Sequence, residues 1–113
     1  MLSQQNRLKN KKDFDRVFKY GKSSKNDFLL LKFKNNNLED SRFGIVVGKK
    51  VSKKAVVRNK IKRRLTEIIK KKLDKIKRGI DVVLITNPGL EKEKFKNLEE
   101  KIENIFKKAN IIC

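Results

Sequence analysis

Basic side chains dominate the one stretch of this sequence whose residue types could do chemistry. Between residues 49 and 64, more than half of the positions are Lys or Arg and none is acidic. Their ammonium and guanidinium groups are the ones that hold phosphate oxygens. The segment also contains Asn59, whose amide can hydrogen-bond a sugar or a base edge where another Lys could not. These residues predict a site that binds nucleic acid.

Most of the groups that proteins use for catalysis are missing. The chain has no His, and its only Cys is Cys113, which excludes a disulfide framework and a Cys-built metal site. No paired carboxylates and no Gly-rich phosphate loop stand out. We therefore expect no catalytic residue, no metal ligand, no cofactor bound by the protein alone and no small-molecule substrate.

Length and charge narrow the class of protein further. The 113 residues are the size of a single domain, and 32 Lys plus Arg against 13 Asp plus Glu give a net charge of +19. Such a surplus favours a polyanionic partner, with nucleic acid first and an anionic membrane surface second. No apolar run approaches the roughly 18 residues of a membrane helix, and no secretory signal is visible. We expect a cytoplasmic protein that does not associate with membranes.

The apolar pattern predicts the elements that position these groups. We expect a mobile basic arm over residues 1–11, and a short helix over 12–20 in which Phe14, Val17 and Phe18 share a face. Gly21 is expected to end that helix, and Ser52 to cap the next one. Further strands and helices are predicted at 27–34 (strand), 42–47 (strand), 54–77 (helix), 80–86 (strand) and 90–109 (helix). The strands at 27–34 and 42–47 are expected to form a hairpin.

The basic segment lies on the long predicted helix, beside its apolar stripe. At about 100° per residue, Arg58 and Lys62 share one row, and Asn59 and Arg63 form the next. The apolar side would be buried against a sheet, and the basic rows would stay exposed. The alternative is an ordinary solvated helix face, but such faces mix charges of both signs, and this one does not.

Three blocks of the sequence resemble the bacterial ribonuclease P protein subunit. They are Asn6-Arg7-Leu8-Lys9 with Asp13-Phe14 and Val17-Phe18, the run Arg42-Phe43-Gly44-Ile45-Val46-Val47-Gly48-Lys49-Lys50, and Arg58-Asn59-Lys60-Ile61-Lys62-Arg63 after Ala55-Val56-Val57. The last block matches the family's "RNR" signature. The resemblance spans roughly residues 6 to 109.

The resemblance implies an α/β two-layer sandwich with the order α-β-β-β-α-β-α. Its four-stranded mixed sheet would need one more strand than the pattern predicts, near residues 22–25. The resemblance also implies a left-handed βαβ crossover around the basic helix, although general rules favour the right-handed form.

The family's function would make this chain a partner of a catalytic RNA. In that family the ribonucleoprotein removes the 5′ leader of precursor tRNA, and the RNA carries out the hydrolysis with Mg²⁺. The residues that would contact the catalytic RNA are Lys49, Lys50, Lys53, Arg58, Asn59, Lys60, Lys62 and Arg63. Lys60 replaces an arginine of the signature and loses its bidentate fork. Thr66 stands where the family often has a basic residue, and Lys70 could compensate.

A second surface would hold the single-stranded leader. The resemblance assigns this cleft to Phe14 and Phe18, whose rings can stack on unpaired bases, together with Leu31 and Phe33 on the following strand. The alternative is that Phe14 and Phe18 form only the core side of a short helix. A structural ribosomal protein or a general RNA-binding protein also remains an alternative for the whole chain.

Overall fold

The computed structural model describes residues 2–26 and 28–112, and the side chain of Phe95 is excluded. Met1, Asp27, which is the first residue of the strand predicted at 27–34, and Cys113 lie outside the described residues. The elements are η1 (Gln4–Asn6), α1 (Lys11–Tyr20), β1 (Lys22–Asn26), β2 (Leu29–Asn35), β3 (Arg42–Val47), α2 (Ala55–Lys72), η2 (Leu73–Lys75), β4 (Ile80–Thr86), η3 (Leu90–Lys92) and α3 (Phe95–Lys108). The order α-β-β-β-α-β-α is confirmed.

Four strands form one mixed sheet in the order β1-β2-β4-β3. Strand β2 pairs antiparallel with β1 on one side and with β4 on the other, whereas β3 pairs parallel with β4. The predicted hairpin between 27–34 and 42–47 is wrong, because β4 lies between those two strands. The hairpin partner of β2 is the extra strand, β1, that the family resemblance implies.

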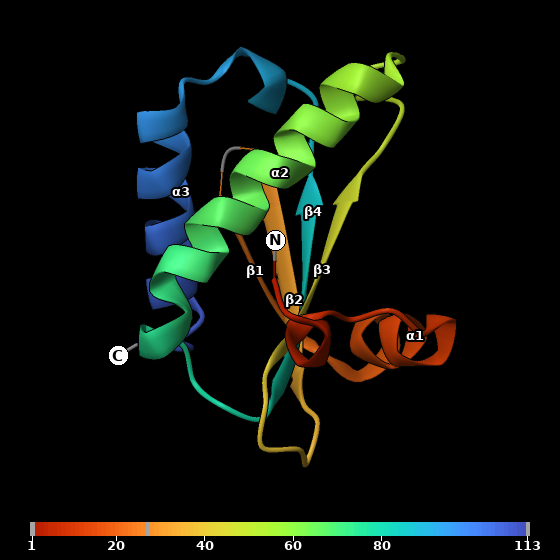
Figure 1. Ribbon diagram of the computed structural model, residues 1–113, viewed down its shortest axis with the longest axis vertical. Helices are drawn as coiled ribbons and strands as arrows, with labels where there is room; N and C mark the ends of the chain where they lie inside the picture. Colours follow the sequence, from red (N-terminus) through yellow and green to blue (C-terminus); the bar gives the residue numbers. More distant parts are fainter. Residues whose placement is uncertain (1, 27, 113) are drawn as a thin grey trace.

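Helices cover both faces of the sheet to different extents (Figure 1). On one face, α2 and α3 bury the main core, which includes Leu65, Ile69, Ile102 and Phe106. On the other face, α1 covers a smaller cluster built around Val17. Strand β4 lies between the two layers, and six of its seven side chains are buried. Its continuous apolar run therefore reflects burial on both faces.

The connection from β3 through α2 to β4 is a left-handed crossover. In Figure 1, β3 rises on the right, α2 passes in front of the sheet, and β4 rises on the left of β3. The family resemblance implies this hand, whereas most βαβ units are right-handed. The crossover places α2 diagonally across one face of the sheet, with its first turns near β3 and its last turn beside α3 (Figure 1).

Three local predictions need correction. The N-terminal segment is held in place, because Leu2 and Leu8 are buried and the Leu8 N–H donates to the Phe43 carbonyl at 2.9 Å. Helix α2 begins at Ala55, with Lys54 at the cap position; the Ser52 hydroxyl accepts only the Lys54 N–H at 3.2 Å. The regular α-helix ends at Lys72, five residues before the predicted end at residue 77.

Candidate nucleic-acid interface

The predicted RNA-contacting residues come together on α2 and on the loop before it. Seven of the eight are exposed, and only Arg58 is half-buried. The apolar side of α2, including Ile61 and Leu65, is buried in the core beneath them. The term basic strip is used below for these eight residues, Lys49, Lys50, Lys53, Arg58, Asn59, Lys60, Lys62 and Arg63.

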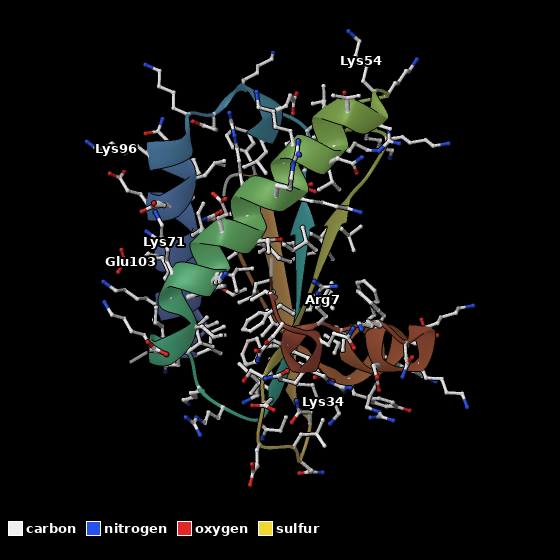
Figure 2. The ribbon with its side chains drawn as sticks, in the orientation of Figure 1. Arg7, Lys34, Lys54, Lys71, Lys96 and Glu103 are labelled. Carbon is white, nitrogen blue, oxygen red and sulfur yellow. The ribbon has the colours of Figure 1, made fainter. Side chains whose placement is uncertain are left out.

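The charge of the basic strip is not neutralised within the protein. None of the ion pairs among the described residues involves a Lys or Arg between positions 49 and 64. The far end of α2 differs, because Lys71 lies 3.5 Å from Glu99 and Lys72 lies 3.8 Å from Glu103, both on α3. Figure 2 shows this separation, with Lys71 and Glu103 at the α3 side and Lys54 at the opposite end of the helix. The unpaired half of α2 is the half that matches the family signature.

Two side chains on α2 are partly occupied by contacts within the protein. The Arg58 guanidinium donates through Nη1 to the Ser52 carbonyl at 2.9 Å, which fixes the loop before the helix. The Thr66 hydroxyl donates to the Lys62 carbonyl at 2.7 Å. Arg58 therefore has a structural contact besides its charge, and Thr66 adds no cation to the row, which resumes only at the exposed Lys70.

An ion cluster fixes α1 against the sheet. Arg42 on β3 donates two hydrogen bonds to Asp81 on β4, at 2.8 and 2.7 Å, and its guanidinium lies 3.2 Å from Asp13 on α1. Asp81 is only 3% exposed and also accepts the Asn36 amide at 2.9 Å. The hydrogen bonds to Asp81 raise the pKa of Arg42 above its ordinary value, against the opposing effect of burial. Arg42 thus stays charged and links both Asp residues.

Two of the four residues assigned to the leader cleft lie on the wrong face of the sheet. Leu31 is 0% exposed and belongs to the core beneath α2 and α3, and Phe33 packs against the same core. Phe14 and Phe18 project from α1, which lies on the opposite face. Phe14 packs against the small cluster around Val17, and Phe18 is 40% exposed. The assignment of Leu31 and Phe33 is therefore wrong for this chain.

The sheet positions that do share the α1 face were not predicted. By strand alternation and register they are Leu30 and Lys32 on β2, Ile85 on β4 and Val46 on β3. Leu30, Lys32 and Ile85 are half-buried, and Val46 is exposed. Together with Phe18 they form a partly open surface with one cation, called the α1 surface below. The run Leu29-Leu30-Leu31 hid it, because three consecutive apolar residues do not reveal which face each one occupies.

The part of the chain that the structure describes holds no group of three or more metal-ligating side chains. Its helices are also too short or too polar to cross a membrane.

Fold and site together define a class of protein, an α/β sandwich whose unneutralised basic helix is suited to binding nucleic acid. The family model described as "Ribonuclease P" matches residues 2–110. The chain therefore belongs to the ribonuclease P protein family, and it is a subunit of ribonuclease P that takes part in tRNA processing. This assignment decides against the alternative of a structural ribosomal protein.

Individual relatives support the same assignment. The chain is 37% identical over 113 residues to the ribonuclease P protein component of a Pseudanabaena species, covering 99% of this chain and 97% of the relative. It is 43% identical over 110 residues to that of a Synechocystis species, covering 94% and 86%. Among solved structures, the Staphylococcus aureus protein matches with a TM-score of 0.88 at 30% identity, covering 96% and 98%. The Thermotoga maritima protein matches with a TM-score of 0.82 at 37% identity, covering 90% and 96%.

Proposed function

We propose that the basic strip binds the catalytic RNA of ribonuclease P. The observation that carries this proposal is that no described acidic residue pairs with a Lys or Arg along the first half of α2, although α3 supplies such partners to the other half. The cations of the basic strip lie on a helix whose apolar side is packed in the core. When they neutralise phosphates, the counterions condensed on the RNA are released, and this release drives association with a folded RNA. The Asn59 amide adds a donor and an acceptor for a sugar or a base edge.

The α1 surface is the proposed site for the 5′ leader of precursor tRNA. It combines the exposed Phe18 ring with Leu30, Val46 and Ile85, and Lys32 supplies a cation. Aromatic and apolar side chains stack on unpaired bases without reading their sequence, and a nearby cation attracts the backbone. Such a surface suits leaders of differing sequence.

Cleavage itself is proposed to be the work of the RNA. The chain offers no His, and its described carboxylates do not gather into a group that could hold a metal ion. The phosphate oxygens of the RNA are hard ligands of the kind that Mg²⁺ prefers. The protein would assist by neutralising phosphates and by positioning the precursor, in the cytoplasm where tRNA precursors are made.

Reconstitution tests this proposal directly. The full chain is added to a bacterial ribonuclease P RNA, and cleavage of a precursor tRNA is measured across a Mg²⁺ titration. We expect the chain to lower the Mg²⁺ concentration needed and to favour precursor over mature tRNA. Equal affinity for both tRNAs, or cleavage by the chain in the absence of any catalytic RNA, would contradict the proposal.

A further inference from the structure

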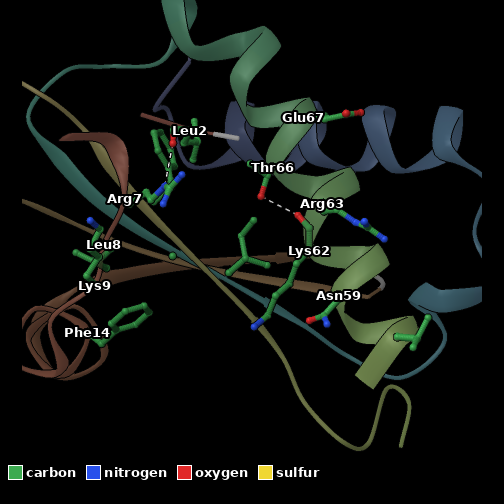
Figure 3. Close-up of a pocket in the computed structure, with 14 residues that line it drawn as sticks. Leu2, Arg7, Leu8, Lys9, Phe14, Asn59, Lys62, Arg63, Thr66 and Glu67 are labelled. Carbon is green, nitrogen blue, oxygen red and sulfur yellow. Dashed lines mark hydrogen bonds between the residues drawn. The ribbon is translucent and has the colours of Figure 1, made fainter. Parts of the chain in front are cut away.

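A groove of ≈ 1000 Å³ follows the free edge of β3, between the N-terminal segment and α2 (Figure 3). Arg7, Leu8 and Lys9 line one wall, and Asn59, Lys62 and Arg63 line the other. Its size is at the upper end of the range of about 300 to 1000 Å³ in which proteins hold small organic groups.

The floor of the groove is apolar. Leu2 and Phe43 are almost fully buried there, and Ile45 is half-buried, so part of its side chain remains accessible. An accessible apolar floor beneath charged walls suits a flat, weakly polar group better than a bare phosphate, which would leave the floor without a partner.

The edge of β3 also presents a peptide donor and acceptor to the groove. The Phe43 carbonyl points outward to the Leu8 N–H, and the Val46 carbonyl points inward, where it accepts the Thr86 hydroxyl at 3.2 Å. Strand alternation therefore turns the N–H and C=O of Ile45 outward, and no described residue bonds to them. A nucleobase edge carries donors and acceptors that can pair with such groups.

The walls supply the charge that a nucleotide requires. Arg7 and Lys9 stand on the N-terminal segment, and Figure 3 shows Lys62 extending from α2 toward the space between the walls. The Arg7 Nε donates to the Leu2 carbonyl at 2.8 Å, which holds this wall in place. Phosphates on either side of an inserted base would meet cations from both walls.

We propose that this groove receives an unpaired nucleotide of the catalytic RNA, with its base on the accessible part of Ile45 and its phosphates between the cations of the two walls. The α2 wall combines the basic-strip residues Asn59, Lys62 and Arg63 with Val56, Thr66 and the acidic Glu67. Because half of this wall belongs to the basic strip, the nucleotide belongs to the RNA that the strip binds. The inference therefore rests on the function proposed above and adds a base-binding site to it.

The substitution Ile45→Thr tests the floor, because it keeps the β-branched shape and removes apolar area. We expect the full chain with this change to bind a bacterial ribonuclease P RNA about fivefold more weakly. Chemical probing of that RNA should also lose the protection of one or a few unpaired nucleotides. The matched control is Ile112→Thr, which makes the same change at a half-buried position outside the groove and outside both proposed binding surfaces. It should leave affinity for the RNA alone and its protection pattern unchanged.

The substitution Lys9→Gln tests the N-terminal wall without touching the core, because Lys9 is exposed and lies outside the basic strip. It should remove protection from the same nucleotides, whereas Lys12→Gln, on an exposed position of α1 outside the groove, should not. This second variant decides the matter if Ile45→Thr lowers stability too far to assay.

The outcomes separate this inference from the proposed function. If Arg63→Ala weakens RNA binding but Ile45→Thr and Lys9→Gln leave affinity and protection intact, the groove is not a base site and the proposed function stands. If no variant weakens binding, both proposals fail. If the affected nucleotides lie in the precursor's leader, the inference is overturned as well, because the groove then serves the substrate.

Discussion

Arg58 and Arg63 lie on the same helix and carry the same charge, yet their surroundings differ. Arg58 is half-buried and donates to the Ser52 carbonyl, so it helps to fix the loop that leads into α2. Arg63 is exposed and has no hydrogen-bond or ion-pair partner among the described residues. Only Arg63 presents a guanidinium whose five donors are all available to phosphates.

The substitution Arg63→Ala should therefore separate binding from stability. We expect the affinity for the catalytic RNA to fall about tenfold, equivalent to about 1.4 kcal/mol, with an unchanged melting temperature. Arg58→Ala should lower both quantities. Filter binding and thermal melting check these outcomes, with Lys75→Ala as the exposed control outside the basic strip. A lower melting temperature for Arg63→Ala with unchanged affinity would make Arg63 a structural residue.

Gly44 on β3 lies directly against the Phe14 ring of α1, which leaves no room for a side chain at position 44. A methyl group built on Gly44 would overlap the Phe14 ring, so any side chain would displace α1 or the ring. We expect Gly44→Ala to reduce the free energy of unfolding by about 1 to 3 kcal/mol, measured by urea denaturation. Gly48→Ala is the matched control, because nothing lies within 4 Å of its added methyl group. Equal effects of the two substitutions would contradict this account.

At the scale of elements, the position of α1 depends on its ion cluster as well as on Val17. Asp13 links α1 to Arg42 on β3, and it also lies 3.7 Å from Arg16 on the same helix; Arg42 and Asp81 remain paired without it. Because arginine stays charged over the pH range of ordinary assays, removing the Asp13 charge is the direct way to weaken the link between α1 and Arg42.

We expect Asp13→Asn to lower the preference for precursor over mature tRNA severalfold, because α1 carries Phe18. The affinity for the catalytic RNA alone should stay the same, and stability should fall by about 1 to 2 kcal/mol. Competition binding with the reconstituted complex measures the preference, and Asp15→Asn, on the exposed side of α1, is the control. If Asp13→Asn instead weakened binding to the catalytic RNA and left the preference for precursor tRNA unchanged, Asp13 would act on the RNA-binding surface and not on the α1 surface.

The sequence was sufficient to predict those elements whose pattern of apolar and charged residues is compatible with one structure only. The apolar residues of α2 recur on one side of the helix, which predicts that this side is buried. The neighbouring residues carry only positive charges, which predicts that they stay exposed to solvent. The pattern failed where the decisive contact is distant in sequence. Strand β4 separates β2 from β3, Phe43 fixes the N-terminal segment, and the register with Leu84 assigns Leu31 to the core. None of these contacts leaves a local signal.

At the scale of the whole molecule, the fold holds a net charge of +19 in a compact body with a radius of gyration of 13.0 Å. That radius is the usual value for a domain of this length, so the charge does not expand the native state. The mutual repulsion instead reduces the stability of the compact chain, and bound anions should relieve it.

Sulfate should therefore raise the melting temperature of the free chain, because it binds the folded state in which the cations are concentrated. Thermal melts over a sulfate series measure the shift, with sodium chloride at equal ionic strength as the control. An identical rise in both salts would indicate general screening, and no rise in either would show that repulsion does not limit stability.

RNA affinity should depend steeply on salt. Each duplex phosphate neutralised by the protein contributes about 0.9 to the slope of log affinity against log salt concentration. We expect Lys62→Gln to reduce that slope by about one contact, whereas Lys75→Gln should leave it unchanged. Titrations between low and moderate potassium chloride provide the measurement, and a flat profile would contradict a phosphate-based interface.

The central position of β4 has a consequence for how the chain is made. A ribosome releases β1, β2, β3 and α2 before β4, yet β2 and β3 have no common neighbour until residue 86 has left the exit tunnel. Until then, β1 and β2 are the two strands of the sheet that can pair. Completion of the sheet, and with it the packing of α2 on the sheet, therefore waits until β4 has emerged from the ribosome.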